Sequence, residues 1–118
     1  YGLKTQHLGQ HAETIATNYL LQKGYVILER NLHIHRYEID IIAEIDHCLV
    51  VMEVKARSSK TYGTAREQLK IKQLKRIFSA FELWVQKKNL GHRSVRFDLI
   101  EYYPKEQKLI HVMDAFRE

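Results

Sequence analysis

Residues 37–57 have the sequence YEIDIIAEIDHCLVVMEVKAR. Two runs rich in β-branched residues predict two β-strands joined by a tight turn, of the kind found inside a sheet and not at its edge. Because side chains alternate along a strand, each strand has two distinct faces. The second strand has a wholly apolar face, Val50, Met52 and Val54, and a mixed face, Val51, Glu53 and Lys55.

The same alternation predicts the faces of the first strand. One face is expected to carry Glu38, Asp40 and Ile42, and the other Ile39, Ile41 and Ala43. The hairpin would therefore bring acidic side chains from two neighbouring strands together.

Carboxylates on adjacent strands repel one another unless a cation joins them. The Cα atoms of Glu53 and Lys55 are expected roughly 7 Å apart, so both side chains could reach one small ligand. A divalent ion held by Asp40 and Glu53, with Lys55 beside it, would relieve the repulsion. The alternative is a face that meets water and carries only a weak Glu–Lys pair. The pattern alone leaves both interpretations open.

The spacing of these residues resembles the core of the PD-(D/E)xK nucleases, an Asp followed by Glu-x-Lys. The longer strings 38–42 and 51–57 resemble the YraN-like family of predicted endonucleases, which is related to the archaeal Holliday-junction resolvases. Further matches to that family are Gly9, Glu13, Tyr19-Leu20, Gly24-Tyr25, Asn31 and Phe97-Asp98. The chain departs from the family pattern at Tyr37 and Ala12, where the family has glycine.

The resemblance implies a restriction-endonuclease-like α/β fold, a central mixed sheet flanked by helices, and a DNA endonuclease that uses Mg²⁺ or Mn²⁺. Asp40, Glu53 and Lys55 would be catalytic, with Asp40 and Glu53 holding the metal and the Val54 carbonyl as an extra ligand. Glu13, from the first helix, and Glu38 would be outer-sphere groups or ligands of a second ion. The related resolvases imply a homodimer.

Composition restricts the class of protein. The chain has 118 residues, which suits one domain spanning 1–118, and a net charge of +5 with a pI near 9.4 favours a polyanionic partner. The single Cys48 excludes an internal disulfide framework and fits a reducing cytoplasm. Because no apolar run has the length of a membrane span, no membrane partner is expected.

The remaining periodicities complete the expected fold. Helical spacing predicts helices over about residues 6–23 and 66–88, and alternation predicts strands over 25–33, 93–103 and 108–112. The last strand is expected at a sheet edge, and the strand–helix–strand order across 66–88 allows one parallel pairing.

Basic residues follow the hairpin and continue along one face of the second long helix. These residues are Arg57, Lys60, Arg66, Lys70, Lys72, Lys75 and Arg76. They are candidates for contacts with nucleic-acid phosphates, and the alternative is an ordinary solvated face.

Three functions therefore remain at this point. The first is a metal-dependent endonuclease acting on DNA, with branched recombination or repair intermediates as candidate substrates. The second is a catalytically silent nucleic-acid-binding module with the nuclease fold, and the third is a structural or partner-binding protein.

Overall fold

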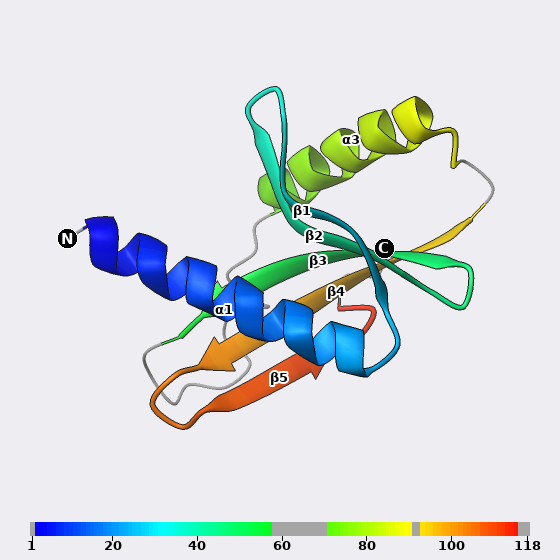
Figure 1. Cartoon of the computed structure of the whole chain (residues 1–118). Coiled ribbons are helices and arrows are strands. Elements are labelled where there is room, and N and C mark those ends of the chain that lie inside the picture. Colours follow the sequence, from blue (N-terminus) through cyan, green and yellow to red (C-terminus); the bar gives the residue numbers. More distant parts are fainter. Residues whose placement is uncertain (1, 58–70, 91–92, 116–118) are drawn as a thin grey trace.

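The computed structural model describes residues 2–57, 71–90 and 93–115 (Figure 1). The elements in order are α1 (Gly2–Gln22), β1 (Val26–Ile34), β2 (Tyr37–Ile45), β3 (Cys48–Ala56), α3 (Ile71–Lys88), β4 (Ser94–Tyr103) and β5 (Lys108–Val112). Strand boundaries lie within one residue of those expected, and α1 begins four residues earlier. The expected start of the second long helix, residues 66–70, lies outside the described residues. In the described ranges, no helix is long and apolar enough to cross a membrane.

The five strands form one mixed sheet in the order β1-β2-β3-β4-β5. All neighbouring strands are antiparallel except β3 and β4, which run parallel, and α3 lies in the connection between them. This confirms the predicted parallel pairing and places β5 at an edge. The described part of the chain is thus a mixed α/β fold with two helices against a central sheet.

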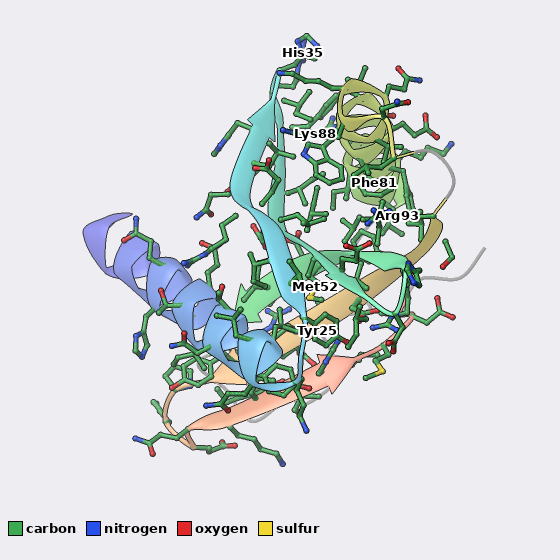
Figure 2. The ribbon with its side chains drawn as sticks, turned by 45° about the vertical axis from the view of Figure 1, so that its right-hand side comes forward. Tyr25, His35, Met52, Phe81, Lys88 and Arg93 are labelled. Carbon is green, nitrogen blue, oxygen red and sulfur yellow. The ribbon has the colours of Figure 1, made fainter. Side chains whose placement is uncertain are left out.

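The two helices cover opposite faces of the sheet (Figure 1). In Figure 2, Phe81 belongs to α3, whereas Tyr25 and Met52 lie on the side of the sheet that α1 covers. The core under α3 contains Ile39, Ile42, Leu49, Val51, Ile77, Ala80, Phe81, Trp84 and Phe97. The core under α1 contains Ala16, Leu20, Tyr25, Ile41, Ala43, Val50, Met52 and Ile100. The two predicted faces of β3 are therefore confirmed.

Both helices end in the same way. Gly24, at φ 93°, follows α1, and the Tyr25 amide donates to the Leu20 carbonyl at 3.0 Å. Asn89, at φ 59°, follows α3, and Leu90 donates to Val85 at 3.1 Å. These bonds satisfy carbonyls that a helix end otherwise leaves without partners, and only Gly or Asn adopts this backbone readily.

Strand β2 does not keep one alternation along its whole length. Ile39 and Ile42 pack under α3, whereas Ile41 and Ala43 pack under α1. The prediction that Ile39 shares a face with Ile41 and Ala43 is therefore wrong. The physical reason lies in the pairing, because β2 pairs with β3 only from Ile41 onward.

The first residues of β2 stay paired with β1 and turn away from β3 with it. This half of the β1–β2 hairpin extends over α3, with His35 at its tip (Figures 1 and 2). The Trp84 indole of α3 donates to the Glu29 carboxylate of β1 at 3.4 Å, which ties the hairpin to the helix.

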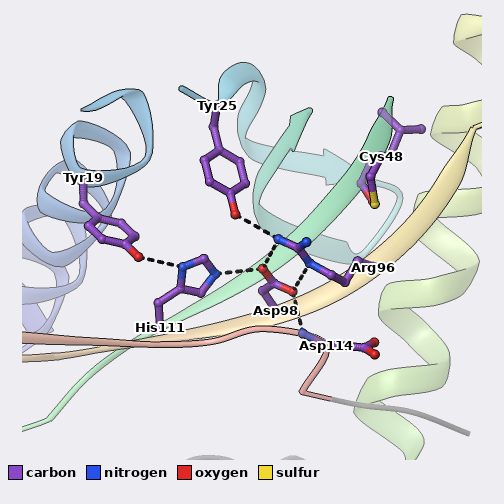
Figure 3. A network of polar contacts seen from close by, with 8 residues as sticks. Tyr19, Tyr25, Cys48, Arg96, Asp98, His111 and Asp114 are labelled. Atoms are coloured by element: carbon purple, nitrogen blue, oxygen red, sulfur yellow. Dashed lines mark hydrogen bonds and ion pairs between the residues drawn. The ribbon is translucent and has the colours of Figure 1, made fainter. Parts of the chain in front are cut away.

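A buried polar network connects β4 with β5 and α1 (Figure 3). Asp98 of β4 is fully buried and accepts hydrogen bonds from Arg96 at 2.9 Å, from His111 of β5 at 2.7 Å and from the Asp114 amide at 2.8 Å. The Tyr19 hydroxyl of α1 bonds His111 Nδ1 at 2.9 Å. Burial would raise the pKa of Asp98, yet the bonds from His111 and Arg96 hold it below its ordinary value.

This network predicts that Asp98 stabilises the fold. An Asp98→Asn change removes the buried charge that Arg96 and His111 face, and breaking a buried pair of this kind costs roughly 3–5 kcal/mol. Urea unfolding of the two proteins measures the loss. The matched control is Asp46→Asn in the exposed β2–β3 turn, where φ is 49° and Asn fits the backbone. Equal unfolding free energies for all three proteins would contradict a stabilising role for the network.

Candidate functional site

Asp40 lies where β2 separates from β3. The first residue pair of β2 and β3 is Ile41–Met52. Asp40 precedes Ile41 and is therefore the first residue of β2 beyond the part that pairs with β3. The Val54 amide of β3, which has no backbone partner on β2, donates to Asp40 Oδ2 at 2.8 Å. The Asp40 side chain thus takes the place of a backbone acceptor on β2. The hydrogen bond from Val54 directs its carboxylate toward β3.

Glu53 brings a second carboxylate to the same place. Its side chain is buried, and the Lys55 ammonium lies 3.2 Å from Glu53 Oε1 on the same face of β3. The carboxyl groups of Glu53 and Asp40 line the same pocket and lie close enough for each to affect the pKa of the other. The structure therefore brings together Asp40, Glu53 and Lys55, the three residues that the sequence pattern singled out.

The electrostatics of this pair are unfavourable without a cation. Burial raises the pKa of Asp40 to about 8, and the charge of Glu53 adds to the rise, with smaller contributions from Glu13 and Glu38. Burial also raises the pKa of Glu53, and the Lys55 ammonium opposes that rise. One ammonium group thus does not neutralise the carboxylates gathered here.

Glu13 approaches the same site from α1, as the resemblance implied. Burial raises its pKa, whereas Arg30 and a hydrogen bond from Asn31 lower it. With its amide turned so that the nitrogen faces Glu13, Asn31 donates to the two carboxylate oxygens at 2.6 and 2.8 Å. Glu38 is more exposed, and its Oε2 lies 3.8 Å from His33 Nε2.

Two pockets open on either side of Asp40. One, of about 190 Å³, also has Glu53 and Arg76 in its wall, and the other, of about 630 Å³, also has Glu13. Glu38 and Asp40 line both pockets. The carboxylates of Glu13, Glu38 and Glu53 therefore lie around Asp40 on two sides.

The donor set of the Asp40–Glu53 pair fits Mg²⁺. Among the residues that the structure describes, no three Asp, Glu, His or Cys side chains are grouped closely enough to hold an ion together. Mg²⁺ does not need such a cage, because it is usually bound by one or two carboxylates, water and substrate phosphates. Two adjacent carboxylates with an unrelieved charge meet that requirement. Ligand roles for Val54, Glu13 and Glu38 stay predictions.

The basic residues predicted from the sequence are only partly described. Arg76 lines the smaller pocket, and Lys75 is exposed next to it on α3. Arg57 is half-buried after β3, with its amide bonded to the Tyr102 carbonyl at 2.8 Å. Lys60, Arg66 and Lys70 lie outside the described residues, as does the side chain of Lys72.

Sequence reasoning missed Arg36 as a residue of this site. It lies in the β1–β2 turn and lines the smaller pocket opposite Arg76. The sequence shows it only as a turn residue, because nothing in the pattern reveals that the hairpin leans over α3.

A model of the uncharacterised protein family UPF0102 matches residues 12–102. The chain belongs to the UPF0102 family. The matched range includes the candidate catalytic and metal-binding residues Glu13, Glu38, Asp40, Glu53, Val54 and Lys55. The family part of the resemblance seen in the sequence is therefore confirmed.

Individual UPF0102 proteins align with nearly the whole chain. The UPF0102 protein of Clostridioides difficile strain 630 is 38% identical over 114 residues, which are 97% of this chain and 100% of that protein. A UPF0102 protein of Clostridium tetani is 34% identical over 95% of each chain. One from a Nocardioides species is 41% identical over 80% of this chain and 77% of its own length.

The raised pKa of Asp40 predicts that an Asp40→Asn substitution changes the stability of the protein in a pH-dependent way when a chelator keeps metal ions away. A carboxyl whose folded pKa exceeds its unfolded value contributes stability below the unfolded pKa, near 4, and loses it as pH rises through about 8. The variant should therefore gain stability relative to the parent protein as pH rises from 4 to about 9. Thermal unfolding across that range measures the difference. Asp46→Asn is the exposed control. If the stability difference between Asp40→Asn and the parent protein does not change with pH, the pKa of Asp40 is not raised.

Proposed function

We propose that this UPF0102 protein is a metal-dependent endonuclease of the PD-(D/E)xK type, which hydrolyses phosphodiester bonds in DNA. The observation that supports it best is that Asp40 and Glu53 line one pocket, with the Lys55 ammonium 3.2 Å from Glu53 Oε1. The mixed sheet, with its parallel β3–β4 pair and helices on both faces, is compatible with a restriction-endonuclease-like fold. Branched recombination and repair intermediates are the candidate substrates.

Each residue has a role that its position allows. When bound, Mg²⁺ or Mn²⁺ would lower the pKa of a coordinated water molecule and stabilise negative charge on the phosphoryl oxygens. Asp40 and Glu53 hold that ion, and the Val54 amide keeps the Asp40 carboxylate in place. Lys55 orients the attacking water or stabilises the charge that develops on the phosphoryl group.

Arg76, in the wall of the smaller pocket, is placed to hold a phosphate of the substrate strand. The neighbouring Lys75 extends the positive surface along α3. Both side chains are exposed, so they can contact a backbone without first breaking a buried interaction.

The first test of this proposal separates metal binding from chemistry. Asp40→Asn keeps the shape and the acceptor for the Val54 amide but removes one charge that holds the ion, so Mn²⁺ affinity and cleavage should both fall. Lys55→Ala should leave Mn²⁺ affinity intact and slow cleavage by about 10²–10³-fold, as the loss of one transition-state donor does. Calorimetry with Mn²⁺ and cleavage of junction, flap, linear and single-stranded DNA measure the two effects.

The second candidate function is a silent nucleic-acid-binding module. The exposed Lys75 and Arg76 of α3 favour it, because these side chains can contact phosphates without a metal ion. If the parent protein binds Mn²⁺ no better than Asp40→Asn and cuts none of these substrates, the nuclease assignment is wrong. Salt-dependent DNA binding in the same preparation would then support the binding module.

The basic surface of α3 predicts how affinity for DNA depends on salt. Replacing Lys75 by Ala removes one phosphate contact and should flatten the plot of log affinity against log salt by roughly 0.9. Lys105→Ala is the matched control, since it removes the same charge from the exposed β4–β5 turn. Fluorescence anisotropy over a salt series gives both slopes. Identical slopes for the two variants would remove α3 from the interface.

A further inference from the structure

Three pockets adjoin one another around the candidate site, since neighbouring pockets share lining residues, and we refer to this row of pockets as the groove. The smaller pocket beside α3 shares Glu38 and Asp40 with the larger pocket beside α1. The larger pocket in turn shares Gln10, Glu13 and Asn31 with a third pocket of about 390 Å³. The groove thus runs from α3, past the Asp40–Glu53 pair, to the cleft between α1 and β1.

Cationic side chains line both ends of this groove, with Arg36 and Arg76 in the first pocket and Arg30 in the third. Glu38, Asp40 and Glu53 share the first pocket with those two arginines, and Glu13 shares the third with Arg30. A chain of phosphates would be held by guanidinium groups at the ends and would need a cation at the centre. A polyanionic strand therefore fits along the groove better than across it.

Beside the carboxylates of Glu13, Glu38 and Asp40, the larger pocket is lined by neutral polar groups. Gln10 of α1 and Asn31 of β1 carry amides, and His33 of β1 carries an imidazole. Amide groups donate and accept hydrogen bonds and match the edges of nucleobases, whereas phosphates are usually held by cations. Since Asn31 directs its nitrogen to Glu13, its carbonyl oxygen is the atom it offers to a ligand.

The size of the larger pocket also suits a base. Its volume of about 630 Å³ lies within the range of roughly 300–1,000 Å³ typical of pockets that enclose small organic ligands. Gly9 adds room, because a Cβ built there would meet nothing within 4 Å. The pocket beside α3, at about 190 Å³, is below that range and suits a phosphate and an ion.

We propose that the pocket of Gly9, Gln10, Asn31 and His33 takes one unpaired nucleobase of the substrate strand. A base stacked within a duplex cannot present its edges to a concave pocket until it leaves the stack. The substrate is accordingly DNA that is unpaired next to the phosphate at Asp40. The inference rests on the proposed function only in placing the scissile phosphate at the Asp40–Glu53 pair.

The test uses binding and requires no turnover. Fluorescently labelled DNA is titrated in Ca²⁺ as three probes: a short single strand, the same strand with abasic central nucleotides, and its blunt duplex. Gln10→Ala should bind the ordinary single strand about three- to tenfold more weakly, as expected for one lost hydrogen bond. It should bind the abasic strand as the parent protein does, because that strand has no base to lose.

Two further variants strengthen the comparison. Gln22→Ala makes the same change on the same helix, roughly 18 Å away, and should bind all probes as the parent does. Gly9→Leu narrows the pocket while removing no polar group, and Leu favours the helix over Gly by several tenths of a kcal/mol. It should weaken binding of the ordinary strand more than binding of the abasic strand. Because this change favours the helix, its loss of binding would not reflect unfolding.

Each outcome decides between the two proposals. Three binding results would overturn the base pocket. Gln10→Ala could bind the ordinary strand as tightly as the parent does, or it could lose equal affinity for the ordinary and abasic strands. The parent protein could also bind the duplex as tightly as the single strand. Cleavage inside a blunt duplex as fast as at unpaired positions would overturn it too and would leave the nuclease proposal standing. A protein that shows the expected binding pattern but cuts no DNA would overturn the nuclease proposal and keep the base pocket.

Discussion

The candidate site depends on the hydrogen bond that the Val54 amide donates to the Asp40 carboxylate. Strand β2 leaves β3 at this position, and a backbone amide that lost its ladder partner would be costly to bury. The Asp40 carboxylate meets that need and lets the strands part. Parting opens both pockets and sends the β1–β2 hairpin over α3. A structural requirement of the backbone thus places the acid at the centre of the groove.

Two buried acids in this chain show opposite electrostatics. Asp98 accepts hydrogen bonds from Arg96, His111 and the Asp114 amide, which hold its pKa below the ordinary value despite full burial. Asp40 has the Val54 amide but faces other carboxylates, and its pKa rises to about 8. The first acid stabilises the fold as an anion. The second is held toward its protonated form when no cation is present, and a pKa perturbed in this way is typical of functional sites.

The two sides of the groove come from elements far apart in the sequence. Residues from α1 and β1 line the larger pocket, and residues from the β1–β2 turn and α3 line the smaller one. Both helices are anchored to the sheet by buried cores. The hydrogen bond from Trp84 to Glu29 also joins α3 to the hairpin whose turn carries Arg36.

Much of this protein could be predicted from local sequence. Period-two alternation identified β3 and its two faces, helical spacing identified α1 and α3, and Gly24 marked the end of α1. The spacing of Asp40, Glu53 and Lys55 placed three groups of the site, because strand geometry is nearly constant per residue. The match to the UPF0102 family confirmed the family part of the resemblance.

Only the tertiary structure decided the rest. Strand alternation assigned Ile39 to the wrong face, because no local pattern shows where β2 stops pairing with β3. The Asp98 network and the position of Arg36 also escaped prediction, since their partners lie on other elements. Local sequence determined which groups each element presents, whereas long-range pairing and packing decided which of them meet. Those contacts depend on the free energy of the whole fold and leave no periodic signal in the chain.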